Sequence, residues 1–250
     1  MGSPEVSIVI PVFNEEESLP RLVEEIQSVM SDTPWAWELL FVDDGSTDGS
    51  RQRLIELAGD EEHIRIAALA ANKGQSCALA AGFRLCRGEL VITLDADLQN
   101  DPADIPLLLA SLENLAAVSG VRQRRQDTWI RRYSSRIANG VRRAVLHDDI
   151  TDVGCSLKAY RIEYLRKVPV FNGFHRFLPA LVQMAGGEVG EVEVGHRARV
   201  FGASKYGVHN RLWRGIADLL AVHWMGRRWI EIESVQELPL RSEELQGNEP

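Results

Sequence analysis

Residues 89–97 read Glu-Leu-Val-Ile-Thr-Leu-Asp-Ala-Asp, an apolar, β-branched run that ends in two aspartates one residue apart. Such a run predicts a buried strand of a parallel sheet. Open α/β sheets bind ligands at the carboxyl ends of their strands, where Asp95 and Asp97 would lie. If the chain stays extended there, both carboxylates point the same way and can converge on Mg²⁺ or Mn²⁺. A solvated acidic turn is the alternative, and the buried strand before it argues against that.

Strand-like and helix-like segments alternate through the first half of the chain. Buried strands are predicted at residues 6–12, 38–42, 64–69, 89–94 and 116–120. Helices are predicted between them, at residues 18–30, 50–59, 74–86 and from 101 onward. This alternation favours an α/β fold with a parallel sheet and right-handed crossovers. After residue 120 the rhythm breaks, and we expect a helix at 177–184, a strand at 188–200 and a helix at 208–229.

The composition describes an ordinary soluble globular protein. Of 250 residues, 45% are hydrophobic and 26% charged, and the formal net charge of -8 argues against a nucleic-acid partner. No apolar run reaches the roughly 20 residues that span a bilayer, and residues 1–4 lead directly into a strand, so we expect no secretory signal. Cys77, Cys86 and Cys155 form no Cys-x-x-Cys pair, which favours reduced thiols and a cytoplasmic location.

Four polar loops follow the predicted strands, at residues 11–15, 43–48, 72–74 and 95–99. Because parallel strands end at one edge of a sheet, we expect these loops to meet there. Asp43 or Asp44 could accept hydrogen bonds from a nucleobase or a ribose, and Lys73 could place a cation against a phosphate. Taken singly, each loop has a sequence that is also typical of helix-capping turns. Only the convergence of the four loops favours a binding site.

Eight arginines against one aspartate, Asp127, lie between Arg122 and Arg143 in a chain that is otherwise acidic. Guanidinium groups suit phosphate oxygens, so the segment favours a phosphorylated substrate or an anionic membrane surface. Nucleic acid is disfavoured because no recognition motif accompanies the arginines. The alternative is a solvated helix face, since Arg132, Arg136 and Arg143 fall at near-helical spacing.

These segments resemble a known family. Residues 9–15 (Val-Ile-Pro-Val-Phe-Asn-Glu), 42–49 (Val-Asp-Asp-Gly-Ser-Thr-Asp-Gly), 72–74 with Gly82, and 95–99 are similar to motifs of family 2 glycosyltransferases, which are inverting enzymes of the GT-A fold. Within the family, the chain resembles the dolichyl-phosphate mannosyltransferase and polyprenyl-phosphate glycosyltransferase branch. The features that suggest this branch are Gln99, Arg122, Asp152-Val-Gly-Cys-Ser-Leu-Lys158 and Arg199-Val-Phe-Gly-Ala-Ser-Lys205.

The resemblance covers residues 6–228 and implies a GT-A (Rossmann-like), mostly parallel sheet flanked by helices, with a C-terminal acceptor-side extension. It implies one domain over residues 1–230, with a nucleotide-sugar half at 1–120 and an acceptor half at 121–230. The tail at 231–250 carries six glutamates against one arginine and is expected to be disordered.

The resemblance also implies roles for single residues. The residues implied to hold the donor are Pro11, Phe13, Asn14, Glu15, Asp43, Asp44, Lys73, Asp95 and Ala96. Those implied to hold Mg²⁺ or Mn²⁺ are Asp95, Asp97 and Gln99. Those implied to hold the acceptor phosphate are Arg122, Arg131, Ser135, Arg199, Ser204 and Lys205, where Arg132 is the alternative to Arg131.

The implied reaction moves a sugar from a GDP- or UDP-linked donor to a polyprenyl (dolichyl or undecaprenyl) phosphate. An acceptor phosphate is already an anion near neutral pH, whereas a hydroxyl acceptor on a polysaccharide or glycolipid would need a base. Asp152 is the candidate base, beside Asp97 as the other catalytic candidate, because His63, His147 and His175 lie away from the motif loops in the sequence.

Two other classes remain as alternatives. A sugar-phosphate nucleotidyltransferase would carry a glycine- and arginine-rich loop after its first strand, and residues 14–17 (Asn-Glu-Glu-Glu) have the wrong charge for it. A non-catalytic module that binds nucleotide or lipid phosphate would need no metal, and the intact Asp95 and Asp97 pair argues against it.

The helix expected at 208–229 has an apolar stripe with tryptophan and arginine at its margins. This pattern suits a helix in a membrane interface, and equally one that packs on the domain. Related enzymes often carry C-terminal transmembrane helices. We expect this chain instead to reach a lipid acceptor as a peripheral protein on the inner face of the membrane, or through a partner. The partners considered are a membrane protein and a second copy of the chain in a homo-oligomer.

Overall fold

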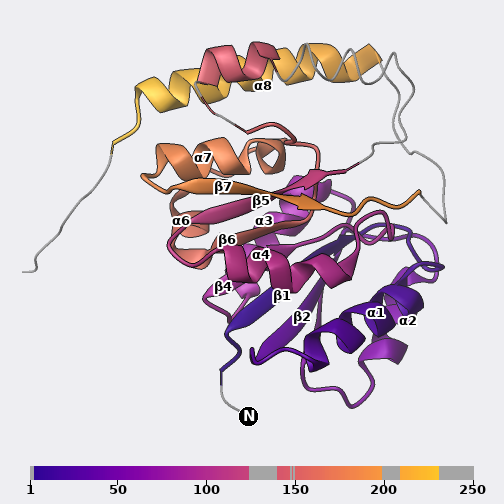
Figure 1. Ribbon diagram of the computed structural model, residues 1–250. Helices are drawn as coiled ribbons and strands as arrows, with labels where there is room; N and C mark the ends of the chain where they lie inside the picture. Colours follow the sequence, from indigo (N-terminus) through magenta and orange to yellow (C-terminus); the bar gives the residue numbers. More distant parts are fainter. Residues whose placement is uncertain (1–2, 124–139, 147, 149, 199–208, 231–250) are drawn as a thin grey trace, which may run out of the picture.

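The computed structural model of the chain describes residues 3–123, 140–146, 148, 150–198 and 209–230 (Figure 1). A seven-stranded sheet in the order β3-β2-β1-β4-β6-β5-β7 forms its centre. The strands are β1 (Val6–Val12), β2 (Trp37–Asp43), β3 (Ile64–Ala68), β4 (Leu90–Thr93), β5 (Ala117–Arg122), β6 (Lys158–Arg161) and β7 (Val189–Val194). Strands β1 to β4 pair in parallel, β6 runs antiparallel to β4 and β5, and β7 is parallel to β5. The predicted α/β fold with a mostly parallel sheet is therefore confirmed.

Helices cover both faces of the sheet. They are α1 (Leu19–Ser31), α2 (Ser50–Ala58), α3 (Gln75–Leu85), α4 (Ile105–Ser111), α6 (Ile162–Lys167), α7 (Leu178–Met184) and α8 (His209–Arg227), with 3₁₀ turns η1 (Pro102–Asp104) and η2 (Phe174–Arg176). Successive side chains of β1 point to opposite faces of the sheet. Ile8 and Ile10 join the core with α1, while Val9 packs towards α3 on the other face. Gly82 lets α3 approach the sheet closely, because a Cβ there would lie 2.3 Å from Val9 Cγ1.

Two features of the sheet were not predicted. Strand β6 and helix α6 fall in a region where the sequence predicted neither, because Lys-Ala-Tyr-Arg has no apolar alternation. Nevertheless Lys158, Ala159 and Tyr160 are buried, since β6 lies between β4 and β5. In addition, β4 ends at Thr93 and Ala96 and Asp97 lie in a turn, so the strand does not continue through residues 95–97 as expected.

Helix α8 lies on the outer side of α7 (Figure 1). It packs on the domain through Leu219 and Val222, which are buried against the core that α7 shares. Ile216, Leu220 and Trp224, spaced four residues apart, are exposed on its other side. The alternative that this helix packs on the domain is therefore confirmed for its inner face, and contact of its exposed face with a membrane stays a prediction. None of the described helices is long and apolar enough to cross a membrane.

Candidate active site

The loops that follow β1 and β2 are bound to each other. The Asn14 amide N–H donates to Ser46 Oγ over 3.0 Å, and the Asn14 carboxamide oxygen accepts from the Thr47 amide over 2.7 Å. Asn14 adopts a φ of 54°, a left-handed conformation that asparagine tolerates better than most residues. The Glu15 amide donates to Ser50 Oγ at the start of α2. These contacts confirm that the first two predicted loops meet at the carboxyl edge.

Asp44 holds the third loop in place. Its Oδ1 accepts from the Lys73 amide over 2.7 Å, and its Oδ2 accepts from the Gly74 amide over 2.8 Å and from Asn72 Nδ2 over 3.1 Å. Asp43 is likewise engaged, by the Ser46 amide at 3.0 Å and by Arg51 Nε at 2.7 Å. Both carboxylates predicted to contact the donor therefore shape the loops that would surround it.

The Asp-x-Asp segment forms the fourth loop. Asp95 Oδ1 accepts from Gln75 Nε2 over 2.8 Å, which ties it to the first turn of α3. Asp97 is buried, and its Oδ1 accepts from the Gln99 amide over 3.1 Å, while Leu98 between them has a φ of 60°. Ala96, a predicted donor contact, is buried beside them.

The oxygen donors of this loop fit Mg²⁺ or Mn²⁺, which bind through one or two carboxylates and complete their shell with water and substrate phosphates. Within the described ranges, no group of three or more His, Cys, Asp or Glu side chains could hold a metal by itself.

A cleft of about 820 Å³ joins these loops to the second half of the chain. Pro11, Lys73 and Asp95 line it on the side of β1 to β4, and Gly154 and Lys158 line it on the side of β6. The volume lies within the range of ligand pockets in proteins, roughly 300–1,000 Å³. The structure thus brings predicted donor residues into one cavity.

Arg122 and Asp152, predicted for the acceptor phosphate and as a base, form a bidentate ion pair. Arg122 Nε donates to Asp152 Oδ2 over 2.8 Å, and Nη2 donates to Oδ1 over 2.9 Å. Both side chains are largely buried, at 14% and 8% exposed. Gly154 leaves room for the guanidinium, because a Cβ there would lie 2.8 Å from Arg122 Nη2. The pair lies directly behind the wall of the cleft that Gly154 forms.

The other arginines of the basic segment divide between the described and undescribed parts of the chain. Arg142 is buried, pairs with Asp148 over 3.2 Å and donates to the Ile150 carbonyl, so it is a structural residue. Burial lowers the pKa of its guanidinium. The predicted acceptor residues Arg131, Ser135, Arg199, Ser204 and Lys205 lie outside the described residues, as does the acidic tail.

Sequence reasoning missed part of the cleft wall. His175, expected to lie away from the motif loops, lines the cleft together with Ser76, Lys158, Tyr160 and Arg176. Burial lowers the pKa of Lys158, whose ammonium donates to the Val153 carbonyl over 3.2 Å. Lys158 belonged to a motif that the sequence singled out, but no local signal marked His175, which η2 carries into the site.

Solved structures share the fold. Glucosyl-3-phosphoglycerate synthase from Mycobacterium tuberculosis, solved with Mn²⁺, UDP-glucose and phosphoglyceric acid, superposes with a TM-score of 0.67 at 20% identity over 88% of this chain and 80% of that chain. A second mycobacterial protein gives a TM-score of 0.67 over 90% of this chain and 74% of its own. At this identity the likeness shows the fold alone, a GT-A-like α/β architecture.

Sequence relatives are closer. The chain is 41% identical to dodecaprenyl-phosphate galacturonate synthase of Rhizobium johnstonii over 90% of this chain and 68% of that protein. It is 42% identical to undecaprenyl-phosphate 4-deoxy-4-formamido-L-arabinose transferase of Proteus mirabilis over 80% of this chain and 62% of that protein. The chain thus spans about two thirds of their length. The predicted resemblance to polyprenyl-phosphate glycosyltransferases is confirmed, because both relatives are named as enzymes of that kind.

The model of the protein family described as "Glycosyl transferase family 2" matches residues 7–169 of this chain. These residues contain the four loops and the segment that leads into β6. The match to this model and the identity to the two relatives show that the chain belongs to glycosyl transferase family 2.

Proposed function

We propose that this chain transfers a sugar from a nucleotide diphosphate sugar to a polyprenyl phosphate, with inversion at the anomeric carbon. The observation that carries the proposal is the single cleft that joins Lys73 and Asp95 to Gly154, with Arg122 directly behind. One side offers groups for a diphosphate, and on the other side the guanidinium of Arg122 lies against Gly154 of the wall, where it would attract a second phosphate. The names of the relatives support this pairing of donor and acceptor.

The donor would lie against the loops of β1 to β4. Pro11, Phe13, Asn14, Glu15, Asp43 and Asp44 would shape the nucleotide site, and Lys73 would face the diphosphate. Asp95, Asp97 and Gln99 would hold Mg²⁺ or Mn²⁺, which when bound neutralises charge on the departing nucleoside diphosphate. The proposed donor is UDP- or GDP-linked.

The acceptor phosphate would enter beside Gly154. As an anion it needs no base, and one of its oxygens attacks the anomeric carbon while the bond from that carbon to the diphosphate oxygen breaks. Arg122 would bind the acceptor and orient the attacking oxygen. Asp152, whose two oxygens accept from Arg122, would position that guanidinium. Asp152 would act as a base only if the acceptor were a hydroxyl group.

A lipid acceptor places the protein at a membrane surface. The exposed Ile216, Leu220 and Trp224 of α8, with Arg227 exposed at its end, support a peripheral position on an anionic membrane. We propose that the chain works at the cytoplasmic face, alone or with a second copy or a membrane-protein partner, and uses no nucleic acid.

The test is transfer of radiolabelled sugar from UDP- and GDP-sugars to undecaprenyl or dolichyl phosphate, with Mn²⁺ or Mg²⁺ and with chelator. The expected result is an organic-extractable product that chelator abolishes and that Asp97→Ala loses. Asp60→Asn, in the exposed turn that follows α2 and not among the residues that line the cleft, is the matched control and should retain activity.

The other outcomes separate the alternatives. Metal-dependent donor hydrolysis without lipid product keeps a transferase and points to a hydroxyl acceptor. Donor binding without any turnover favours the non-catalytic module, and no binding of any donor overturns the proposal.

A further inference from the structure

A serine and a histidine that are 99 residues apart in the chain form a pair inside the cleft. Ser76 Oγ and His175 Nδ1 lie 2.8 Å apart. Ser76 Oγ also accepts from the Gly173 amide over 2.8 Å. The serine is 4% exposed, so its hydroxyl is committed to these partners. Ser76 thereby holds the turn that carries His175 at two points.

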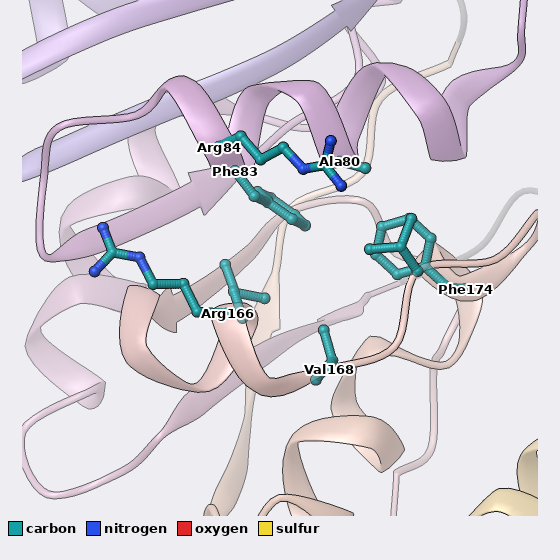
Figure 2. Close-up of a pocket in the computed structure, with 8 residues that line it drawn as sticks. Ala80, Phe83, Arg84, Arg166, Val168 and Phe174 are labelled. Atoms are coloured by element: carbon teal, nitrogen blue, oxygen red, sulfur yellow. The ribbon is translucent and has the colours of Figure 1, made fainter.

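The same turn is anchored on two further sides. Phe174 is fully buried and packs edge-on against Phe83 and Phe171, with ring centroids 6.3 Å away in each case. Figure 2 shows Phe83 of α3 and Phe174 among the side chains that line a small cavity of about 330 Å³ between α3 and α6. Arg176 is fixed by Asp218 of α8 over 2.8 Å. His175 is therefore held in position before any ligand binds, which is the preorganisation that recognition sites require.

The Ser76–His175 pair is compatible with an imidazole proton on Nε2. Ser76 Oγ already accepts the Gly173 N–H, and in this tautomer its own proton points to His175 Nδ1. We infer this tautomer, in which the ring proton lies on Nε2, the nitrogen that Ser76 does not contact. Among the residues that the structure describes, none accepts from Nε2. The cleft thus receives an N–H donor from a neutral ring.

The surroundings keep this ring neutral. Burial, with Arg176 and Lys158 nearby, lowers the pKa of His175 to about 3. The ring therefore cannot exchange a proton with substrate at neutral pH, and it offers a fixed donor rather than an acid or a base.

The contacts of α3 suggest which part of the ligand His175 would meet. Gln75 contacts Asp95, where the diphosphate would lie, and the next residue, Ser76, contacts His175. Because His175 and Asp95 line one cleft and are joined through consecutive residues of α3, we infer that His175 faces the sugar attached to the diphosphate. Tyr160 also lines this cavity, and its buried hydroxyl has no hydrogen-bond partner among the described residues. Two unused polar hydrogens suit a ligand rich in acceptor oxygens.

We propose that His175 is a specificity-determining residue, which donates its Nε2–H to an oxygen of the donor sugar, and that Ser76 is the residue that positions it. This inference rests on the proposed function, because it presupposes a nucleotide-sugar donor.

The test uses two replacements that separate the two ring nitrogens. The amide nitrogen of Gln reaches the place of Nε2, whereas that of Asn reaches the place of Nδ1. We expect His175→Asn to weaken the binding of the sugar nucleotide by roughly 10-fold or more, and His175→Gln to retain most of it. The probes are UDP and GDP, and UDP-glucose, UDP-galacturonate and GDP-mannose, titrated calorimetrically with Mn²⁺. Both variants should bind the free nucleoside diphosphates as the unmodified protein does.

The outcomes are distinguishable. If His175→Asn binds like the parent and His175→Gln does not, the histidine only supports the turn and the inference is overturned. Equal losses for UDP and UDP-sugar overturn it as well. If the parent chain binds no nucleotide at all, the proposed function fails first. Long-range ¹H–¹⁵N correlation of His175 checks the tautomer, and a proton on Nδ1 contradicts the assignment independently of binding.

Discussion

Arg176 and Asp218 join the wall of the cleft to the outer helix α8, with Nη2 donating to Oδ2 over 2.8 Å. Arg176 lines the cleft, and Asp218 lies one residue before Leu219, through which α8 packs on the domain. The helix that carries the exposed apolar stripe is therefore attached to the element that presents His175. Contact of α8 with a membrane would therefore affect the wall of the cleft through this ion pair.

Asp218→Asn should lower kcat/KM several-fold with little loss of stability. The pair is partly exposed, and such pairs contribute about 0–1 kcal/mol, but Arg176 would lose its fixed orientation. Sugar transfer and urea unfolding measure the two effects. Arg53→Gln, which removes an exposed pair with Glu56 on α2, is the control and should change neither. A large stability loss without an effect on activity would contradict the link.

Gly173→Ala should destabilise the fold by more than the cost of its backbone conformation. Gly173 has a left-handed backbone (φ 99°, ψ -4°), which costs alanine about 1 kcal/mol. The new Cβ would in addition meet Arg176 Nη2 at 2.6 Å and Asp218 Oδ2 at 2.8 Å. Asp218→Ala removes one of these two groups, so Gly173→Ala should lower the urea midpoint less in Asp218→Ala than in the parent chain, and equal decreases would show that the ion pair moves aside freely.

Asp44→Asn should raise the KM for the donor by roughly 10-fold or more. Its carboxylate accepts from two backbone amides and one side chain of the 72–74 loop, and an amide group would face these donors with a donor of its own. Kinetics with varied donor and fixed acceptor measure the effect. An equal rise in the acceptor KM would argue against a donor-side role.

The stability of the fold should fall as the pH drops below about 6.5, in part because of His175. Its pKa is about 3 in the folded chain, below the value of 6.5 in an unfolded one, so between these values the unfolded chain binds the extra proton. One such group contributes at most about 1.4 kcal/mol per pH unit. Urea unfolding at pH 7 and pH 5 should show a smaller difference for His175→Gln. An identical difference would mean that the ring is protonated in the fold.

Leu220→Gln combined with Trp224→Gln should weaken sedimentation with anionic vesicles of phosphatidylglycerol. The two side chains are 59% and 62% exposed on one face of α8, where they would enter the headgroup region. Ile55→Gln removes an apolar side chain of 53% exposure from α2 and should bind vesicles as the parent does. Transfer to a short, water-soluble prenyl phosphate should be unaffected by the double variant. A loss there would place the defect in the site rather than at the membrane.

Local sequence determined the half of the site that parallel strands build. The apolar runs of β1, β2, β3 and β4 reveal the strands without reference to the rest of the chain, and their order in a parallel sheet brings their carboxyl ends to one edge. For that reason the loops at Asn14, Asp44 and Asp95 could be grouped in advance. Family membership could be recognised from the same loops, since their residues are contiguous.

Tertiary structure alone decided the other half. Strand β6 has four residues and places Lys158 in the interior, against the rule that lysine lies at the surface, because β4 and β5 enclose it. The bond between Ser76 and His175 spans 99 residues, and no periodic pattern encodes a contact at that separation. The physical reason is one of range. Periodicity reports which face of a single element is buried, whereas the partners that meet in a cleft are selected by packing between elements far apart in the chain.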